Sequence, residues 1–346
     1  MNRFSALVCA ILLSLAPTAF AQQGALKPGS GIHTPALSQI LDHATNLGPL
    51  KTVVIAQHGE ILAERGYRGH SVTAPTNIKS ASKTIISALV GIAIDKGILQ
   101  GVDQNIAPLL REDLPPDPDP RIEDITIGHL LSMQAGLTRT SGRNYGRWVN
   151  SRNWVRAALA QPFADDPGGD MLYSTGSTHL LSAILTQEAG RSTLDLAREW
   201  LGPAKNFAIA GWHRDPQGIY LGGNQMAMSA KSLLAFGELY RNGGRAADGR
   251  QLIPRGWIEQ SWRLRTHSRF TGDGYGHGWF LREIGGHDVR YAWGYGGQML
   301  YIVPSLGLTC VMTSDDSRPA GRTGYRAELH GLMSEIIRAL EPSSNN

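Results

Sequence analysis

The sequence contains only two cysteines in 346 residues, and this scarcity limits how the fold can be held together. Cys9 lies in an N-terminal segment that we expect to be removed, which leaves Cys310 alone. A single cysteine cannot form an intrachain disulfide, although disulfides form and persist in compartments outside the cytoplasm. The core must therefore be stabilised by packing.

Long hydrophobic runs are also missing. The apolar run from Ala6 to Leu15 follows Arg3 and is shorter than the ~20 residues needed to span a bilayer. Ala19-Phe20-Ala21 then places small residues where signal peptidase requires them. We therefore expect residues 1–21 to be a signal peptide and the mature protein to be periplasmic or secreted. Nothing after residue 21 approaches a spanning length, so we expect no membrane association after cleavage.

The chain carries little excess charge of either sign. Lys plus Arg total 33 against 29 Asp plus Glu, and the basic residues are scattered along the sequence. No run alternates cations with aromatic residues, as a groove for single-stranded nucleic acid would. We therefore expect no nucleic-acid partner.

Two common catalytic patterns are absent. The sequence has no Gly-x-Ser-x-Gly motif, which argues against the nucleophile elbow of α/β-hydrolases. Its eleven histidines show neither His-x-His nor His-Glu-x-x-His spacing, which argues against catalytic zinc. His129 and His179 fall within helical patterns and are interpreted as packed or surface residues. We expect neither a metal nor another cofactor.

Both ends of the chain predict parts of one antiparallel sheet layer. Apolar residues at helical spacing predict a helix around Leu37 to Ala44 and a closing helix around Leu329 to Leu340. Between these helices, β-rich runs are bounded by turn residues. The strand-like runs are 52–57, 61–67, 275–283, 299–303 and 308–313.

The long middle of the chain, roughly residues 76 to 264, is mainly helical by its apolar pattern. We therefore predict an α+β fold in which an antiparallel β-sheet is flanked by N- and C-terminal helices and carries a large, mainly helical insertion. The sheet domain is discontinuous and consists of 22–75 and 265–346. The helical domain is 76–264, and the active site lies between the two.

Ser80 and Lys83 form a candidate nucleophile and base. If Ser80 opens the helix that runs to Ile94, the two side chains lie one turn apart and can meet. A serine hydroxyl becomes nucleophilic when a base takes its proton, and a lysine can do so only if its pKa is lowered. The same spacing also fits an ordinary solvated pair, so further motifs must support the assignment.

Two such motifs follow: Tyr173-Ser174-Thr175 ahead of a helix, and Trp293-Gly294-Tyr295-Gly296-Gly297-Gln298 leading into a strand. In this order the three elements resemble the serine β-lactamase and penicillin-binding-protein superfamily, whose signatures are Ser-x-x-Lys, Tyr-x-Asn and Lys-Thr-Gly or variants. Further segments, such as Ile127 to Met133 and Tyr275 to Trp279, resemble its class C-type branch. The resemblance covers about residues 50 to 340 and implies that 22–346 is one β-lactamase-related unit.

The resemblance implies a role for each motif residue. Ser80 would be the acylated nucleophile, and Lys83 and Tyr173 would exchange its proton. Backbone N–H groups of the nucleophile and of the third-motif strand would form the oxyanion hole, with the Tyr295 N–H as the leading candidate. Tyr173 also fits a core tyrosine, and the glycines also fit a tight turn. The remaining oxyanion or substrate-binding candidates are Gly294, Gly296, Gly297, Gln298 and Thr175.

Two departures from the family pattern bear on the substrate. The third motif has no Lys or His where penicillin-recognising members carry a cation, and Thr175 replaces the asparagine of the second motif. A substrate carboxylate would lose its fixed partner there, so we expect potent β-lactamase activity to be absent. The segment from Gly294 to Gln298 resembles instead the branch of esterases and 6-aminohexanoate-dimer hydrolases.

The sequence therefore predicts an exported serine hydrolase of carboxylesterase or amidase type that cleaves a small, uncharged ester or amide through a Ser80 acyl-enzyme. Two alternatives remain open. One is a β-lactamase or D-alanyl-D-alanine peptidase of the same fold. The other is a non-catalytic family member that binds peptides or a protein partner. The sequence does not indicate an oligomeric state.

Overall fold

The computed structural model describes residues 35–321 and 323–341, and the predicted signal peptide lies outside these residues. Its main feature is an eight-stranded antiparallel sheet in the order β2-β1-β11-β10-β9-β8-β7-β6. Because β1 pairs with β11, the two ends of the chain build one sheet, as predicted. The strands are β1 (Leu50–Gln57), β2 (Glu60–Gly66), β6 (Thr266–His267), β7 (Gly274–Tyr275), β8 (Phe280–Ile284), β9 (His287–Gly294), β10 (Gln298–Val303) and β11 (Leu308–Ser314).

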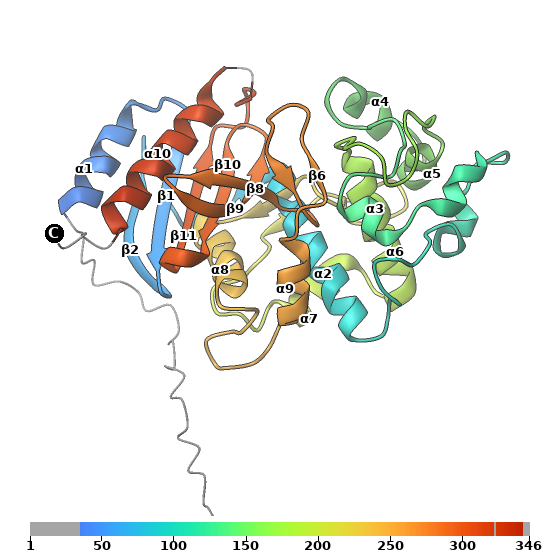
Figure 1. Cartoon of the computed structure of the whole chain (residues 1–346), viewed down its shortest axis with the longest axis horizontal. Helices are drawn as coiled ribbons and strands as arrows, with labels where there is room; N and C mark the ends of the chain where they lie inside the picture. The colour runs from blue at the N-terminus through green and yellow to red at the C-terminus, as the bar shows by residue number, and fades with distance from the viewer. Residues whose placement is uncertain (1–34, 322, 342–346) are drawn as a thin grey trace, which may run out of the picture.

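Helices cover both faces of the sheet. The N-terminal α1 (Pro35–His43) and the closing α10 (Tyr325–Leu340) lie side by side over one face (Figure 1). On the other face α8 (Ala230–Arg241) packs against β1, β10 and β11. Gly237 allows this close approach, because a Cβ there would lie 2.5 Å from Leu300 Cδ1. The predicted helical range thus also supplies one layer of the sheet domain.

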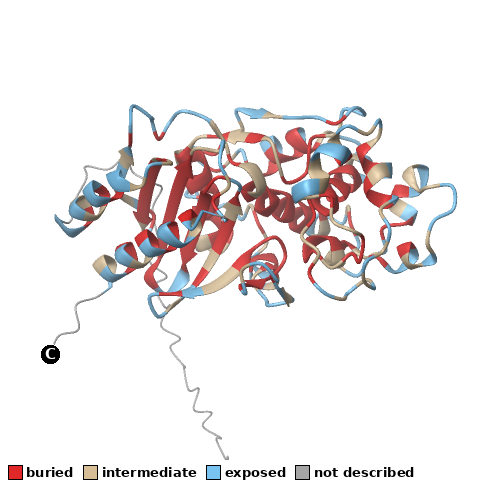
Figure 2. Ribbon diagram, turned by 90° about the horizontal axis from the view of Figure 1, so that it is seen from above, coloured by how far each residue is buried: buried red, intermediate tan, exposed pale blue. Residues whose placement is uncertain are grey.

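The remaining helices form the second part of the molecule (Figure 1). The buried helix α2 lies between the sheet and this part, so its residues reach both (Figure 2). The helices are α2 (Lys83–Asp95), α3 (Ile127–Leu131), α4 (Tyr145–Val149), α5 (Trp154–Leu159), α6 (Thr175–Ala189), α7 (Thr193–Trp200) and α9 (Arg255–Ser261).

Short elements connect these layers. A small antiparallel sheet of β3 (Thr76–Asn77), β5 (Met226–Met228) and β4 (Gly211–Trp212) ties the start of the helical part to its later segments. The 3₁₀ turns are η1 (Ala44–Asn46), η2 (Lys79–Ser82), η3 (Pro108–Asp113), η4 (Pro120–Asp124), η5 (Gly142–Asn144) and η6 (Pro304–Leu306).

The strand pattern near the C-terminus differs from the prediction in two ways. The run 275–283 is not one strand, because the chain leaves the sheet between β7 and β8. There Gly278 adopts a φ of +85° and its N–H donates to the carbonyl oxygen of Leu131. The strand β9 was missed, although buried Val289 and Tyr291 flank the more exposed Arg290, the alternation that marks a half-buried strand. Within residues 35–321 and 323–341, no helix has the length and apolar character needed to cross a membrane.

Candidate active site

Ser80 lies in the 3₁₀ turn η2, immediately before α2, rather than in the α-helix itself. The chain reaches it through Lys79, whose backbone has the left-handed φ of 51° that is uncommon for a residue with a side chain. The side-chain oxygen of Asn77 accepts a hydrogen bond from the Lys79 N–H at 3.0 Å and holds this turn. Strained backbone of this kind concentrates at functional sites, which makes Ser80 a candidate for chemistry.

Lys83, the first residue of α2, places its amine among three oxygen atoms. Its Nζ lies 2.7 Å from the carbonyl oxygen of Gly223, 3.1 Å from Ser80 Oγ and 3.2 Å from Thr175 Oγ1. A carbonyl can only accept, so one N–H points to Gly223. A neutral amine has one more N–H, which Thr175 can accept, and its lone pair is left to accept the Ser80 hydroxyl proton. The three contacts therefore match an amine poised as a base.

The electrostatics of Lys83 favour this neutral form. The side chain is fully buried at the junction of the two parts of the molecule. Burial penalises the charged ammonium and lowers the pKa of Lys83 from 10.5 to about 7. A large fraction of the molecules therefore carries an unprotonated amine near neutral pH. A lowered pKa is the condition under which Lys83 can act as a base.

Three residues hold the amine of Lys83 in place. The sequence motifs predicted this role for none of them. Ser141 Oγ lies 3.0 Å from Thr175 Oγ1 and accepts a hydrogen bond from the Thr175 N–H at 2.8 Å. Gly223 has a φ of +79°, and a Cβ there would lie 2.5 Å from Lys83 Cγ. Thr175, predicted to bind substrate, lines the cavity in front of Ser80 and also contacts the lysine directly. Nothing in the sequence links the carbonyl group of Gly223 to Lys83.

Tyr173 joins Ser80 and Lys83 from the segment just before α6. Its ring contacts Tyr275 edge-on and stacks on Phe280, and the Lys83 Nζ lies 5.2 Å from the ring centroid. Burial raises the pKa of Tyr173 above its usual value, and the neighbouring Ser80 hydroxyl offsets part of this rise. Tyr173 therefore stays protonated where Lys83 loses its proton. The structure brings the three predicted catalytic residues together.

The third-motif segment forms the turn between β9 and β10 beside Ser80. Gly294 allows β9 to approach the residues before the serine, because a Cβ there would lie 2.2 Å from the carbonyl oxygen of Ile78. Gly296 and Gly297 have φ values of +83° and +100°, which favour glycine. Tyr295 is half exposed and lines the cavity in front of Ser80.

Gln298 does not face this cavity. Its side chain is fully buried; its amide nitrogen donates to the Ser314 carbonyl at 2.8 Å, and its amide oxygen accepts from the Ser314 N–H at 3.1 Å. Both polar ends are therefore occupied by β11. The residue fixes the start of β10 rather than contacting substrate.

A cavity of about 770 Å³ opens in front of Ser80. Tyr173 and Thr175 reach it from the helical side, and Trp293 and Phe280 reach it from the sheet side. Its size and its mixture of aromatic and polar side chains suit a small organic substrate. The cavity thus lies between the sheet and the helical part of the molecule.

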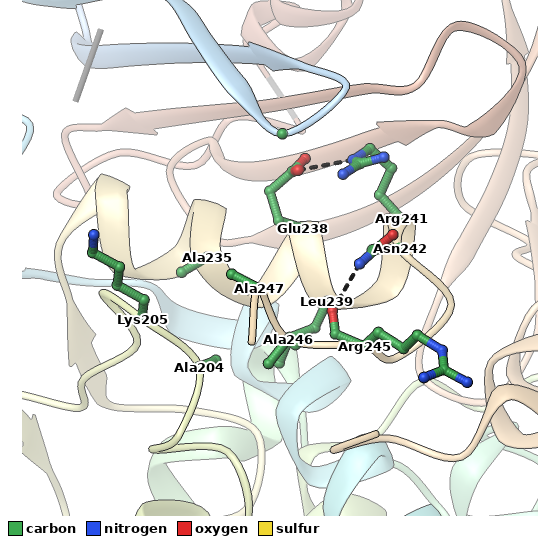
Figure 3. A pocket seen from close by; sticks show the side chains of 11 residues that line it. Ala204, Lys205, Ala235, Glu238, Leu239, Arg241, Asn242, Arg245, Ala246 and Ala247 are labelled. Atoms are coloured by element: carbon green, nitrogen blue, oxygen red, sulfur yellow. Dashed lines mark hydrogen bonds and ion pairs between the residues drawn. The ribbon is translucent and has the colours of Figure 1, made fainter. Parts of the chain in front are cut away.

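Other parts of the described chain offer less. The hollow in Figure 3 has about 50 Å³ of space and lies at the end of α8. Glu238 and Arg241, two of its charged residues, pair with each other, and none of the predicted site residues lines it. Among residues 35–321 and 323–341, no group of three or more His, Cys, Asp or Glu side chains is placed to hold a metal ion.

This fold, with a serine beside a buried lysine at the junction of a sheet and a helical part, defines a serine-hydrolase scaffold. The family comparison gives the same class, since the beta-lactamase family profile matches residues 51–332, most of the chain. The chain belongs to the beta-lactamase family. The predicted superfamily and the predicted α+β fold are thereby confirmed.

Solved structures share the fold at low sequence identity. A Bacillus anthracis protein assigned as a 6-aminohexanoate-dimer hydrolase superposes with a TM-score of 0.71, is 18% identical, and the match covers 93% of this chain and 87% of that one. EstCE1, described as a hydrolase with promiscuous acyltransferase activity, gives a TM-score of 0.70 at 17% identity, over 86% of this chain and 97% of that one. At these identities the likeness extends to the fold alone.

A curated relative is more similar in sequence but over a shorter stretch. The fimbrial assembly protein FimD of Dichelobacter nodosus serogroup H1 is 32% identical over 150 residues. The match covers 41% of this chain and 37% of that protein, so the chain spans well under half of the relative's length.

Proposed function

We propose that the protein is a serine hydrolase of carboxylesterase or amidase type that works through an acyl-enzyme on Ser80. The observation that carries the proposal is the buried amine of Lys83, whose pKa is lowered to about 7 and whose Nζ lies 3.1 Å from Ser80 Oγ. A lone surface pair would have neither the burial nor the contacts with Gly223 and Thr175.

Each step of the reaction has a residue to carry it. As Ser80 Oγ attacks the substrate carbonyl carbon, its proton passes to the neutral amine of Lys83. The resulting oxyanion lies near the N–H groups of Ser80 and Tyr295. As the carbonyl-to-leaving-group bond breaks, the Tyr173 hydroxyl gives its proton to the leaving oxygen or nitrogen and recovers one from the Lys83 ammonium.

Water completes the cycle. It attacks the Ser80 ester, gives a proton to the Lys83 amine, and the acid leaves as the proton returns to Ser80 Oγ. No metal or cofactor enters these steps. The likeness to EstCE1 and to the Bacillus anthracis protein supports an ester or amide substrate, and the missing third-motif cation argues against efficient β-lactam turnover.

The test is covalent labelling of the mature protein. A fluorophosphonate probe and a 4-nitrophenyl ester are expected to add their phosphonyl or acyl mass to the peptide that contains Ser80. Ser80→Ala should abolish the adduct and keep the melting temperature, while Ser71→Ala, a surface serine, should label like the wild type. Labelling that persists in Ser80→Ala would refute the proposal, and a folded protein that no acyl donor labels would favour the non-catalytic binder.

Export belongs to the same proposal. Residues 1–21 carry the features of a signal peptide, so we expect the mature chain to begin at Gln22 and to lie outside the cytoplasm. N-terminal sequencing of the protein from fractionated cells checks this. An unprocessed chain in the cytoplasmic fraction would contradict it and leave the chemistry unaffected.

A further inference from the structure

The wall of the catalytic cavity is basic. Lys79, Arg139 and Arg143 all line it, and among the described residues no Asp or Glu does so. Lys79 is neutralised from outside the cavity, because its Nζ lies 2.9 Å from a carboxylate oxygen of Asp316. Within the described part of the chain neither arginine has an ion-pair partner of its own. The cavity therefore holds two positive charges without counterions.

Arg139 is held so that it can bind an anion. Its guanidinium carbon lies 4.7 Å from the centroid of the Phe270 ring, in a stacked contact at the cavity mouth. Phe270 sits in the loop between β6 and β7, which an ion pair between Arg269 and Asp170 ties to the helical part. Stacking occupies a face of the guanidinium and leaves its N–H donors, which lie in the plane, free to bind a carboxylate at two points.

The exposed position of the Phe270 ring is not explained by packing in the core of the fold. Its ring is 71% exposed, the most exposed of the large apolar side chains in the described chain. Packing therefore does not account for its position. Contact with Arg139 at the entrance of the cavity does, because the ring limits the orientations of a side chain that would otherwise be free to move.

We propose that Arg139, supported by Arg143, recognises a carboxylate on the substrate, so that the enzyme prefers anionic esters or amides. This inference rests on the proposed function, since it assigns the substrate class of the Ser80 site. It replaces the sequence-based expectation of an uncharged substrate. Arg139 lies on a different element from the third-motif strand, the segment between α3 and η5.

Matched substrates test the preference. The 4-nitrophenyl monoester of glutaric acid carries a carboxylate on the acyl side, and the same ester with a terminal carboxamide is its neutral partner. An acetate ester of 4-hydroxy-3-nitrobenzoate, with the corresponding benzamide, places the charge on the leaving group. We expect kcat/KM to be about tenfold higher for the anionic member of one pair, since a charge-assisted hydrogen bond contributes about that much. The pair that responds shows which side of the scissile bond faces Arg139.

Variants assign the preference to one side chain. Arg139→Gln should reduce the ratio of anionic to neutral kcat/KM about tenfold, and Arg139→Lys should restore part of it. Arg147→Gln is the matched control, because this exposed arginine on α4 lies outside the catalytic cavity and should leave the ratio unchanged. Raising the ionic strength should lower the wild-type ratio, and melting temperatures should show that all variants fold.

The possible outcomes distinguish a failure of the carboxylate assignment from a failure of the proposed hydrolase function. If neutral esters acylate Ser80 but both pairs give ratios of one or less, the carboxylate assignment is wrong and the hydrolase stands. If the ratio is high but Arg139→Gln and Arg147→Gln lower it equally, the general charge of the region acts and Arg139 does not. If no ester acylates Ser80, the proposed function itself fails.

Discussion

The carbonyl oxygen of Gly223 is the nearest hydrogen-bond partner of Lys83 Nζ, at 2.7 Å, closer than the hydroxyl of Ser80 at 3.1 Å. This contact joins α2 to a loop 140 residues further along the chain. It fixes one N–H of the amine. The second N–H then points at Thr175, and the lone pair of the nitrogen points at Ser80. The backbone of Gly223 thus orients Lys83, which requires that this backbone approach the lysine closely.

Gly223→Ala should remove activity without unfolding the protein. A Cβ at this position would lie 2.5 Å from Lys83 Cγ and 2.4 Å from Thr178 Oγ1, so Lys83 must move. Misplacing a catalytic group by about an ångström lowers kcat on the order of 100-fold. Burst kinetics with a 4-nitrophenyl ester measures the effect, and circular dichroism checks the fold.

Gly218→Ala is the control for the backbone cost of this change. Gly218 also has a left-handed φ, +86°, but a Cβ there meets nothing within 4 Å. Both variants pay a backbone strain of roughly 1–2 kcal/mol, and only Gly223→Ala displaces the lysine. Equal activities in the two variants would show that the Gly223 contact does not position the base.

The three catalytic residues could be predicted from the sequence because their chemistry depends on their residue types. Ser80 and Lys83 lie within one helical turn, and Tyr173 was found through a motif shared with a known superfamily. Gly223 and Ser141 could not be assigned a role in the same way. A carbonyl oxygen is common to every residue, and a serine hydroxyl acquires a role only when the fold brings it to a partner. Their contacts with the Lys83 and Thr175 region span 140 and 34 residues of sequence.

The third-motif candidates differ in where they lie relative to the turn between β9 and β10. Tyr295 belongs to the turn, whereas Gln298 is the first residue of β10. Tyr295 lines the cavity, whereas Gln298 is buried against Ser314. The predicted strands β1 and β11 were found because their apolar runs are long. The missed β9 contains charged residues on its more exposed face, which weakened its apolar signal.

The pH dependence of acylation should report the pKa of Lys83. The base must be neutral, so kcat/KM is expected to rise about tenfold per pH unit below pH 7 and to level off above it, since burial lowers the pKa to about 7. A lysine with the ordinary value of 10.5 would instead give a rate that keeps rising to that pH. Tyr173 adds no falling limb below about pH 10, because its pKa is raised.

The measurement is the rate of Ser80 labelling by a neutral fluorophosphonate between pH 5 and 10, expressed as a second-order constant. Tyr173→Phe should lower the rate and keep a rising limb, because the base is still present. A wild-type limb centred near pH 10 would contradict the assignment of Lys83 as a neutral base in the resting enzyme.

Lys83→Met should make the protein more stable while abolishing its activity. The folded pKa of about 7 lies below the unfolded value of 10.5, so folding opposes the charged amine. This cost is fully present below pH 7, declines between pH 7 and 10.5, and disappears above that range. Removing it should raise the free energy of unfolding at pH 6 by a few kcal/mol, with a gain that narrows toward pH 10.5.

Urea unfolding at several pH values measures this gain. Lys96→Met, an exposed lysine at the end of the same helix, should show little change at any pH. A Lys83→Met protein that is less stable than the wild type throughout the pH range would mean that the contacts of the amine outweigh the cost of its burial.

His179 should help to position Lys83 indirectly, through the Gly222-Gly223 segment. Its Nδ1 accepts a hydrogen bond from the Gly222 N–H at 3.3 Å, so its Nε2 carries the proton and donates to Asp215, 3.1 Å away. Both side chains are fully buried. The ring thereby fixes the residue that precedes Gly223, whose carbonyl orients the lysine. The interpretation of His179 as a packed residue is thus compatible with an indirect effect on the base.

His179→Leu should therefore lower kcat about tenfold and move the rising limb of the labelling rate toward higher pH, because a loosened Gly222-Gly223 segment lets water reach Lys83. His179→Asn, which can still accept from the Gly222 N–H, should recover part of both effects. The control is His330→Leu: His330 is also buried, but it lies on α10 with Tyr301 as its partner. That change should lower the melting temperature and leave the limb near pH 7. If His179→Leu lowers the melting temperature and the rate but does not move the limb, its role is structural only, and the base is held by Gly223 and Thr175 without it.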